Sequence, residues 1–247
     1  MPPAQVEVTC GLRAGLAVFS RRREEIERIA YVRSVRAEVA ALTRWAASCH
    51  MPCAEMTDRE LERMARSAQH EGLCVSAKPR GWLPASELGR MLERAQGTAL
   101  ALDRVRNPYN IGALLRTAAF FGLDAVLLGA PAPHPGLAPT AVRVAEGGAE
   151  HVRLCRTTDL ATTLARLRER GVRVIGAEGG ATTPAIGFAF ARPTVLIVGN
   201  ERGGLGERIR SACDAVVAIP GRGAVESLNV AVAGGILMAE LTRGKRG

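Results

Sequence analysis

Short apolar runs alternate with amphipathic segments through the second part of the chain. Runs rich in valine, isoleucine and leucine predict buried strands over residues 98–103, 125–128, 151–155, 172–177, 194–199 and 215–220. Apolar residues spaced three or four apart predict helices over residues 113–121, 159–170, 205–212 and 228–242. This alternation is typical of an α/β domain whose mostly parallel sheet is covered on both faces.

A smaller α/β unit, residues 5–78, precedes this domain. The pattern predicts helices over residues 11–22, 36–49 and 58–68, and strands over residues 26–32 and 72–78. In the second helix, one side carries Val39, Leu42, Trp45 and Ala46. Proline, glycine and charged residues then predict a linker. We therefore divide the chain into a small domain (1–78), a linker (79–95) and a larger domain (96–247).

An arginine stands inside the apolar helix of residues 113–121. An Asn107-Pro108 turn precedes this helix, and Asn110 is placed to be its N-cap. Arg116 has few polar neighbours in the sequence. One interpretation is a solvated arginine on an amphipathic helix. The other is an arginine that faces a cleft holding an anion or a polar substrate group, and the local sequence leaves both open.

Two glycine-containing loops also follow predicted strands, "VGNERGGLG" at residues 198–206 and "IPGRGAVESLN" at residues 219–229. Glycines after a strand let main-chain N–H and C=O groups face a ligand, which suits a nucleoside. Each loop taken alone also fits ordinary turns, with Ser227 as a helix N-cap. Because ligands of parallel sheets bind at the carboxyl ends of the strands, all three loops are candidates for one site.

The common nucleotide and metal motifs are missing from these loops. The first strand of the larger domain runs into "RVRNPYN" rather than G-x-G-x-x-G, and the sequence holds no G-K-[ST]. It also holds no H-E-x-x-H, no paired C-x-x-C and no G-x-S-x-G. We therefore expect no dinucleotide fold of the usual kind and no metal site.

Composition adds a charge argument. The chain has 247 residues, 47% of them hydrophobic, which is enough for a sizeable core. Its formal charge of +9 suits a polyanionic partner. The six cysteines are scattered, so we expect free thiols. The first residues do not resemble a signal peptide and no apolar run is long enough to span a membrane, so we expect a cytoplasmic protein without membrane contact.

Three motifs carry a specific resemblance. They are N-x-G-x-x-x-R-T-A at residues 110–118, V-G-N-E-x-x-G-L at 198–205 and I-P-x-x-G-x-x-x-S-L-N-V-x-V-A at 219–233. In order and spacing they resemble the motifs of the SpoU (TrmH-like) family of RNA 2′-O-ribose methyltransferases. The resemblance covers residues 96–247. It implies the SPOUT fold with a deep trefoil knot, a homodimer and S-adenosylmethionine as the cofactor. Residues 5–78 resemble the ribosomal-protein-like domain with which many members bind RNA.

The resemblance also implies site residues. The catalytic set would be Asn110, Arg116, Glu201, Ser227 and Asn229. The cofactor would lie among Gly199, Asn200, Gly203, Ile219, Gly221, Ser227, Leu228 and Asn229. Gly221 departs from the pattern, since members often have methionine there. The RNA, tRNA or rRNA, stays open.

Chemistry suggests how these residues would act. Transfer of a methyl group to a ribose 2′-OH requires alignment of oxygen, carbon and sulfur. The planar guanidinium of Arg116 would hold the 2′-OH and a phosphate, while a phosphate oxygen or water accepts the proton. Three alternatives remain: an RNA-binding relative without activity, a base methyltransferase, or a small-molecule α/β enzyme.

Overall fold

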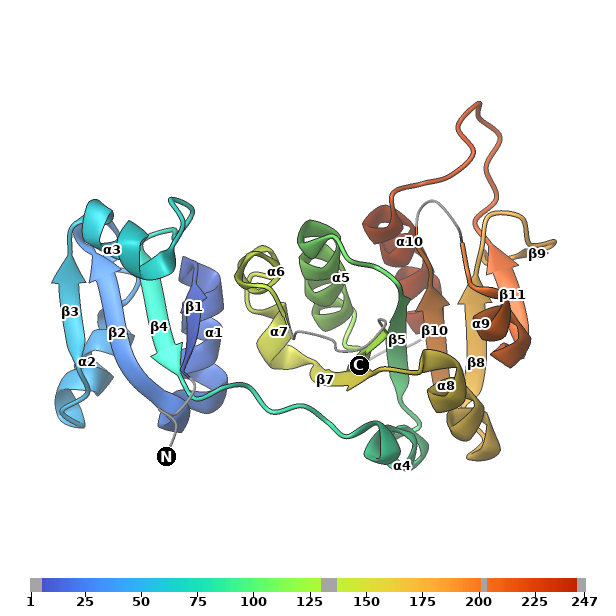
Figure 1. Cartoon of the computed structure of the whole chain (residues 1–247), viewed down its shortest axis with the longest axis horizontal. Helices are drawn as coiled ribbons and strands as arrows, with labels where there is room; N and C mark the ends of the chain where they lie inside the picture. The colour runs from blue at the N-terminus through green and yellow to red at the C-terminus, as the bar shows by residue number, and fades with distance from the viewer. Residues whose placement is uncertain (1–5, 130–136, 201–203, 244–247) are drawn as a thin grey trace.

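The computed structural model describes residues 6–129, 137–200 and 204–243, and it contains two α/β units (Figure 1). The smaller unit comes first in the chain and the larger second, as the sequence pattern predicts. The two units lie next to each other, with the first helix of the small unit beside the short helices of the large one.

The small unit is built on a mixed four-stranded sheet in the order β1-β4-β2-β3. One face packs against two helices around Val18 and Leu42, and the other against a third helix through Leu61. The elements are β1 (Glu7–Cys10), α1 (Leu12–Arg22), η1 (Arg23–Glu25), β2 (Ile26–Val32), η2 (Arg33–Val35), α2 (Ala40–Ser48), β3 (Cys53–Met56), α3 (Asp58–Ala65) and β4 (Leu73–Ala77).

Two strands of this unit do not appear in the sequence prediction. β1 and β3 have four residues each, too few for a clear alternation of apolar and polar positions. The helix predicted over residues 36–49 begins only at Ala40, because the chain first forms η2 and a turn. Val39, Leu42 and Ala46 are buried on one side, as predicted.

The large unit is built on a seven-stranded, fully parallel sheet in the order β7-β6-β5-β10-β8-β11-β9. Its strands are β5 (Thr98–Asp103), β6 (Ala125–Gly129), β7 (Arg153–Thr157), β8 (Arg173–Ala177), β9 (Thr183–Pro184), β10 (Thr194–Val198) and β11 (Ala215–Ala218). Its helices are α4 (Ala85–Ala95), α5 (Pro108–Phe120), α6 (Pro139–Val144), α7 (Gly148–His151), α8 (Leu160–Glu169), α9 (Glu207–Ala212) and α10 (Val230–Thr242).

Alternate residues of each strand face two different helical layers. In β5, Leu100 and Leu102 belong to the core formed with α5 and α10, whereas Ala99 and Ala101 belong to the core formed with α4 and α8. The sheet is therefore buried on both faces, which explains why its strands read as continuous apolar runs. This confirms the α/β fold class.

The segment predicted as a linker, residues 79–95, contains structure of its own. The backbone N–H of Leu83 donates to the Leu154 carbonyl at 2.7 Å, so this stretch covers the edge strand β7. Helix α4 follows, and its Leu88 and Leu92 are buried against the large sheet. Helix α4 thus packs as part of the large unit, while the domain boundaries themselves stay a prediction.

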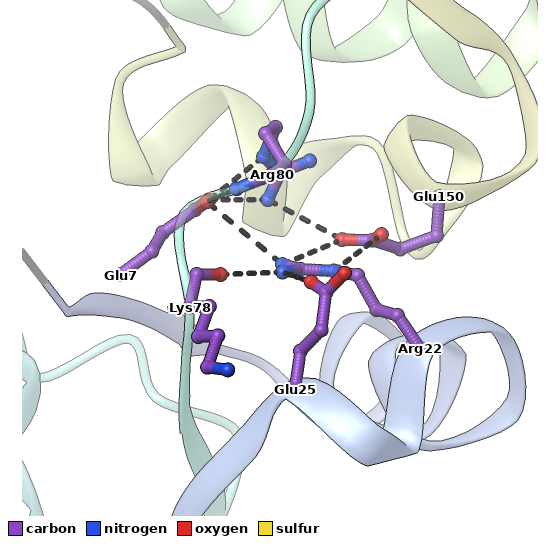
Figure 2. A network of polar contacts seen from close by, with 6 residues as sticks. All are labelled: Glu7, Arg22, Glu25, Lys78, Arg80 and Glu150. Carbon is purple, nitrogen blue, oxygen red and sulfur yellow. Dashed lines mark hydrogen bonds and ion pairs between the residues drawn. The ribbon is translucent and has the colours of Figure 1, made fainter.

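A network of charged side chains joins the two units (Figure 2). Arg22 of α1 donates from Nε to Glu150 of α7 at 2.9 Å. Arg80, in the connecting segment, donates from Nε to Glu7 of β1 at 2.8 Å and lies 3.3 Å from Glu150. The side chains of Arg22, Arg80 and Glu150 are at most 11% exposed. Their desolvation makes this junction sensitive to the loss of any one partner.

Strands β5 and β10 lie side by side at the middle of the large sheet, where the direction of strand progression reverses. The loops that follow β5, β10 and β11 leave the sheet at its carboxyl end. They are the three loops singled out from the sequence. The knot that the family resemblance implies stays a prediction. No helix within the described ranges has both the length and the apolar character that crossing a membrane requires.

Candidate active site

Helix α5 begins at Pro108, five residues before the predicted range and three before the start that an Asn110 cap implies. Asn107 is its N-cap, because Oδ1 accepts a hydrogen bond from the Tyr109 N–H at 2.9 Å, and Pro108 occupies the first helical position. The expectation that Asn110 caps this helix is therefore wrong. Asn110 lies in the first turn of α5, where its side chain meets the start of α10.

Asn110 and Asn229 form the contact that joins two of the three motifs. Asn229 is the N-cap of α10, and its Oδ1 accepts from the N–H groups of Ala231 at 2.9 Å and Val232 at 3.4 Å. Its Nδ2 donates to Asn110 Oδ1 at 3.1 Å. The two ends of one amide thus serve different purposes, one fixing the helix start and the other fixing Asn110.

Ser227 is not the N-cap of α10, since Asn229 takes that position. It lies in the loop between β11 and α10, which extends from the body of the large unit (Figure 1). Five of the residues assigned to the cofactor belong to this loop. Ile219 is half-buried, and the exposed ones are Gly221, Ser227, Leu228 and Asn229. Nothing lies within 4 Å of a Cβ built on Gly221, so packing alone does not require glycine there.

Arg116 lies on the exposed face of α5. Tyr109, Ala113, Arg116 and Phe120 have the spacing of one helical face, and the rings of Tyr109 and Phe120 are largely exposed. The Arg116 side chain is 53% exposed, and its Nη1 donates to Glu146 Oε1 at 2.7 Å. Glu146 follows α6 and is not among the residues that the motifs indicate.

The structure does not bring Arg116 to the pair formed by Asn110 and Asn229. Six residues along a helix correspond to about 9 Å and to roughly a third of a turn around the axis. In the described part of the chain, the hydrogen-bond partner of Arg116 is Glu146. Glu201, the remaining member of the predicted catalytic set, lies outside the described residues.

The loop after β10 makes a tight turn that depends on glycine. The Gly204 N–H donates to the Asn200 carbonyl at 3.0 Å, and a Cβ on Gly199 would overlap the Gly204 carbonyl. Gly199 therefore allows two backbone segments to approach each other. Asn200 donates from Nδ2 to the Arg104 carbonyl at 3.3 Å. Gly203, also assigned to the cofactor, lies outside the described residues.

Two residues that the sequence analysis did not select brace this turn. Asp103, only 5% exposed at the end of β5, accepts from the Gly206 N–H at 3.2 Å. Arg104 donates from Nη2 to the Gly204 carbonyl at 3.0 Å, and its own φ of 57° lies in the left-handed region. The sequence signal for these two residues is a charged pair at the end of an apolar strand. The backbone groups that they contact lie about a hundred residues later in the chain, so the sequence does not show the contact.

In the described part of the chain, no group of three or more His, Cys, Asp or Glu side chains is arranged to hold a metal ion. The groups that the structure gathers at the three loops are the amide side chains of Asn110, Asn200 and Asn229, the guanidinium of Arg104 and backbone groups of the glycine-containing loops. Such groups bind through hydrogen bonds and suit a ligand with a nucleoside and a phosphate.

Comparisons with known proteins agree with this architecture. The model of the SpoU rRNA Methylase family matches residues 97–239. A 23S rRNA (guanosine-2′-O-)-methyltransferase RlmB from Pseudomonas aeruginosa is 37% identical over 208 residues, which cover 83% of both chains. An uncharacterized tRNA/rRNA methyltransferase from Mycobacterium ulcerans is 33% identical over 202 residues, or 81% of this chain; the chain spans 65% of the length of that relative.

The fold comparison extends over both units. The crystal structure of an AdoMet-bound rRNA methyltransferase from Sinorhizobium meliloti has a TM-score of 0.80, covers 98% of this chain and 88% of its own, and is 22% identical. The similarity thus includes the small mixed sheet as well as the parallel one. Together with the family model and the three motifs, it shows that this chain belongs to the SpoU rRNA methylase family.

Proposed function

We propose that this protein is an S-adenosylmethionine-dependent methyltransferase that methylates a ribose 2′-OH in rRNA or tRNA. The observation that carries the proposal is the hydrogen bond between Asn110 and Asn229, which joins the first and third family motifs at the carboxyl end of a parallel sheet. The RlmB relative favours a guanosine of 23S rRNA as the first substrate to test.

The residues present suit S-adenosylmethionine. The turn at Gly199 and Gly204 is one where a side chain on Gly199 would not fit, and the loop after β11 offers backbone groups and the Ser227 hydroxyl. We assign the cofactor to these two loops, with Gly199, Asn200, Gly203, Ile219, Gly221, Ser227, Leu228 and Asn229 as the contacting residues. The AdoMet-bound relative supports the use of this cofactor. When bound, the cofactor supplies the methyl group.

The chain's own side chains would then position the RNA. The fork of Arg116 binds the ribose 2′-OH and a neighbouring phosphate, and its charge stabilises the oxygen as the proton leaves. Because a guanidinium has N–H donors and no acceptor atom, a phosphate oxygen or water takes the proton. Asn110 and Asn229 fix the geometry of the pocket, Ser227 extends its hydrogen bonds, and Glu201 orients Arg116 or the ribose.

The small domain and a second copy of the chain complete the proposal. We assign RNA binding to residues 1–78, in line with the net positive charge. We assign a homodimer interface to α10, because one side packs on α5 while Val232 on the other side is 53% exposed. We also propose that the protein acts in the cytoplasm.

Replacement of Arg116 tests the activity. Arg116→Ala is expected to bind S-adenosylmethionine as the wild type does in isothermal titration, and to lose most methyl transfer to unmodified rRNA or tRNA transcripts. The matched control is Arg166→Ala, which removes an exposed arginine from α8 on the opposite face of the sheet. Nuclease digestion and mass spectrometry identify the product, and a methylated base or unchanged turnover of Arg116→Ala would refute the proposal.

A further inference from the structure

One carboxylate links the two units of the protein through the arginine of the first motif. Glu146 accepts from Arg116 Nη1 with Oε1 at 2.7 Å, and from Arg13 Nη1 with Oε2 at 2.5 Å. Arg13 belongs to α1 of the small unit, whereas Arg116 belongs to α5 of the large unit. Each oxygen of Glu146 thus serves one arginine.

The backbone places Glu146 here at a cost. Its φ is 44°, in the left-handed region that residues other than glycine rarely adopt. Gly147 follows with a φ of 91°. Non-glycine residues in such conformations persist where the surrounding structure holds them, and they gather at functional sites. An ordinary turn at this place would carry glycine or asparagine rather than a glutamate that bridges two arginines.

Packing holds this turn between the two helices that carry the arginines. A Cβ on Gly147 would lie 2.7 Å from the Ala17 side chain of α1, and one on Gly148 would lie 2.8 Å from Cα of Arg116. The turn therefore fits only because both residues lack a side chain. A shift of α1 relative to α5 would therefore move the backbone segment that carries Glu146.

A partner of this kind is what the proposed role of Arg116 requires. An arginine side chain that is half exposed loses rotamer entropy when it is fixed. A carboxylate that binds one nitrogen fixes the side chain in advance and leaves other N–H groups of the fork to bind a substrate. Alignment is the larger part of catalysis for this reaction, so a fixed guanidinium speeds transfer without tighter substrate binding.

We propose that Glu146 is a positioning residue for Arg116, and that Arg13 makes this positioning depend on the docked small domain. The inference rests on the proposed function of Arg116. The Glu146 carboxylate thereby links the small domain, which binds the RNA, to the arginine at the reacting ribose. The link acts on the rate of transfer rather than on the affinity for RNA or cofactor.

Variants of the full-length protein test the link. With tritiated S-adenosylmethionine and an unmodified rRNA transcript, Glu146→Gln should lower kcat roughly tenfold, with KM for RNA and cofactor affinity changed less than about twofold. Glu146→Asp, which keeps the charge, should recover part of kcat. Arg13→Ala should lower kcat in the wild type and have no further effect beside Glu146→Gln. Arg166→Ala, which removes an exposed charge from α8 on the opposite face of the large sheet, should leave kcat unchanged.

A second measurement does not depend on activity. Phenylglyoxal modifies arginines that are not ion-paired more quickly, and mass spectrometry reports its rate at Arg116. Glu146→Gln should raise this rate several-fold. Unchanged labelling, or a kcat that stays equal or rises in an active Glu146→Gln protein, would overturn the inference. If no variant and no wild-type protein transfers methyl groups, the proposed function fails, and the labelling still decides whether Glu146 holds Arg116.

Discussion

One amide side chain and one carboxylate each bind more than one partner in this protein. Asn229 caps α10 with its oxygen and holds Asn110 with its nitrogen, and Glu146 divides its two oxygens between Arg13 and Arg116. A substitution that removes such a side chain removes two contacts together. Substitutions that change one atom can separate them, which is how the structural and catalytic contributions are told apart.

Asn229→Asp keeps the capping oxygen of α10 and removes the N–H groups that face Asn110. Aspartate is as good an N-cap as asparagine, so we expect the free energy of unfolding in urea to stay within about 0.5 kcal/mol of the wild type. Methyl transfer should fall strongly, because Asn110 then faces a carboxylate.

The matched variant Asn229→Ala removes both contacts. It should lose activity and also about 1 kcal/mol of stability, the usual cost of a lost cap. Wild-type turnover by Asn229→Asp would show that the amide nitrogen is not needed. Equal stability of the two variants would show that the cap contributes nothing here.

Asp103, Arg104 and Glu146 mark what the sequence alone does not reveal about the site. Motifs list residues near each other in the chain, whereas Asp103 and Glu146 act on partners in distant segments. The assignment of Asn110 as an N-cap failed for a related reason. Asn107 followed by Pro108 is the stronger start signal, and it shifts the helix by one turn.

At the scale of elements, the sequence pattern was most informative where strands are buried on both faces. β5 and β8 differ from the predicted ranges by at most one residue, because runs of four residues without a polar side chain, at 99–102 and 174–177, leave little freedom. The sequence predicts a linker where helix α4 lies, because the charged face of this helix dominates the local composition. Its Leu88 and Leu92 have helical spacing, but only the large sheet shows that they are buried.

Helix α10 has one side packed on the core and an exposed apolar residue on the other. Its Val230, Leu237 and Leu241 are buried against the core, while Val232 is exposed on the other side. A carboxylate at an apolar interface is not compensated, so Val232→Asp should dissociate the proposed dimer. Analytical ultracentrifugation at micromolar concentration measures this change.

The control for this variant is Val6→Asp, which places a carboxylate at an exposed valine of the small unit. It should sediment as the wild type does. A wild-type protein that sediments as one 26.1 kDa species would contradict the dimer at once.

The position of the small unit relative to the large one depends on the charged junction between them. Glu7 and Glu150 meet Arg22 and Arg80 there, and most of these side chains are withdrawn from water (Figure 2). A junction of this kind keeps α1 at a fixed place beside α7, and so keeps Arg13 within reach of Glu146. The stability of the junction and the positioning of Arg116 are therefore two consequences of one interface.

The pKa of Glu7 gives this junction a pH dependence. Burial raises that pKa, but hydrogen bonds and charge from Arg80, with Arg22, outweigh burial and lower it below 4.5. A lowered folded-state pKa stabilises the protein above pH 4.5, and the stabilisation is lost as pH falls through the folded value. At pH 7 the free energy of unfolding in urea should therefore be about 1–3 kcal/mol lower for Glu7→Gln than for the wild type. This difference between the two proteins should become smaller towards pH 3. The exposed control Glu27→Gln should show little change, and a gap for Glu7→Gln that stays constant with pH would contradict the argument.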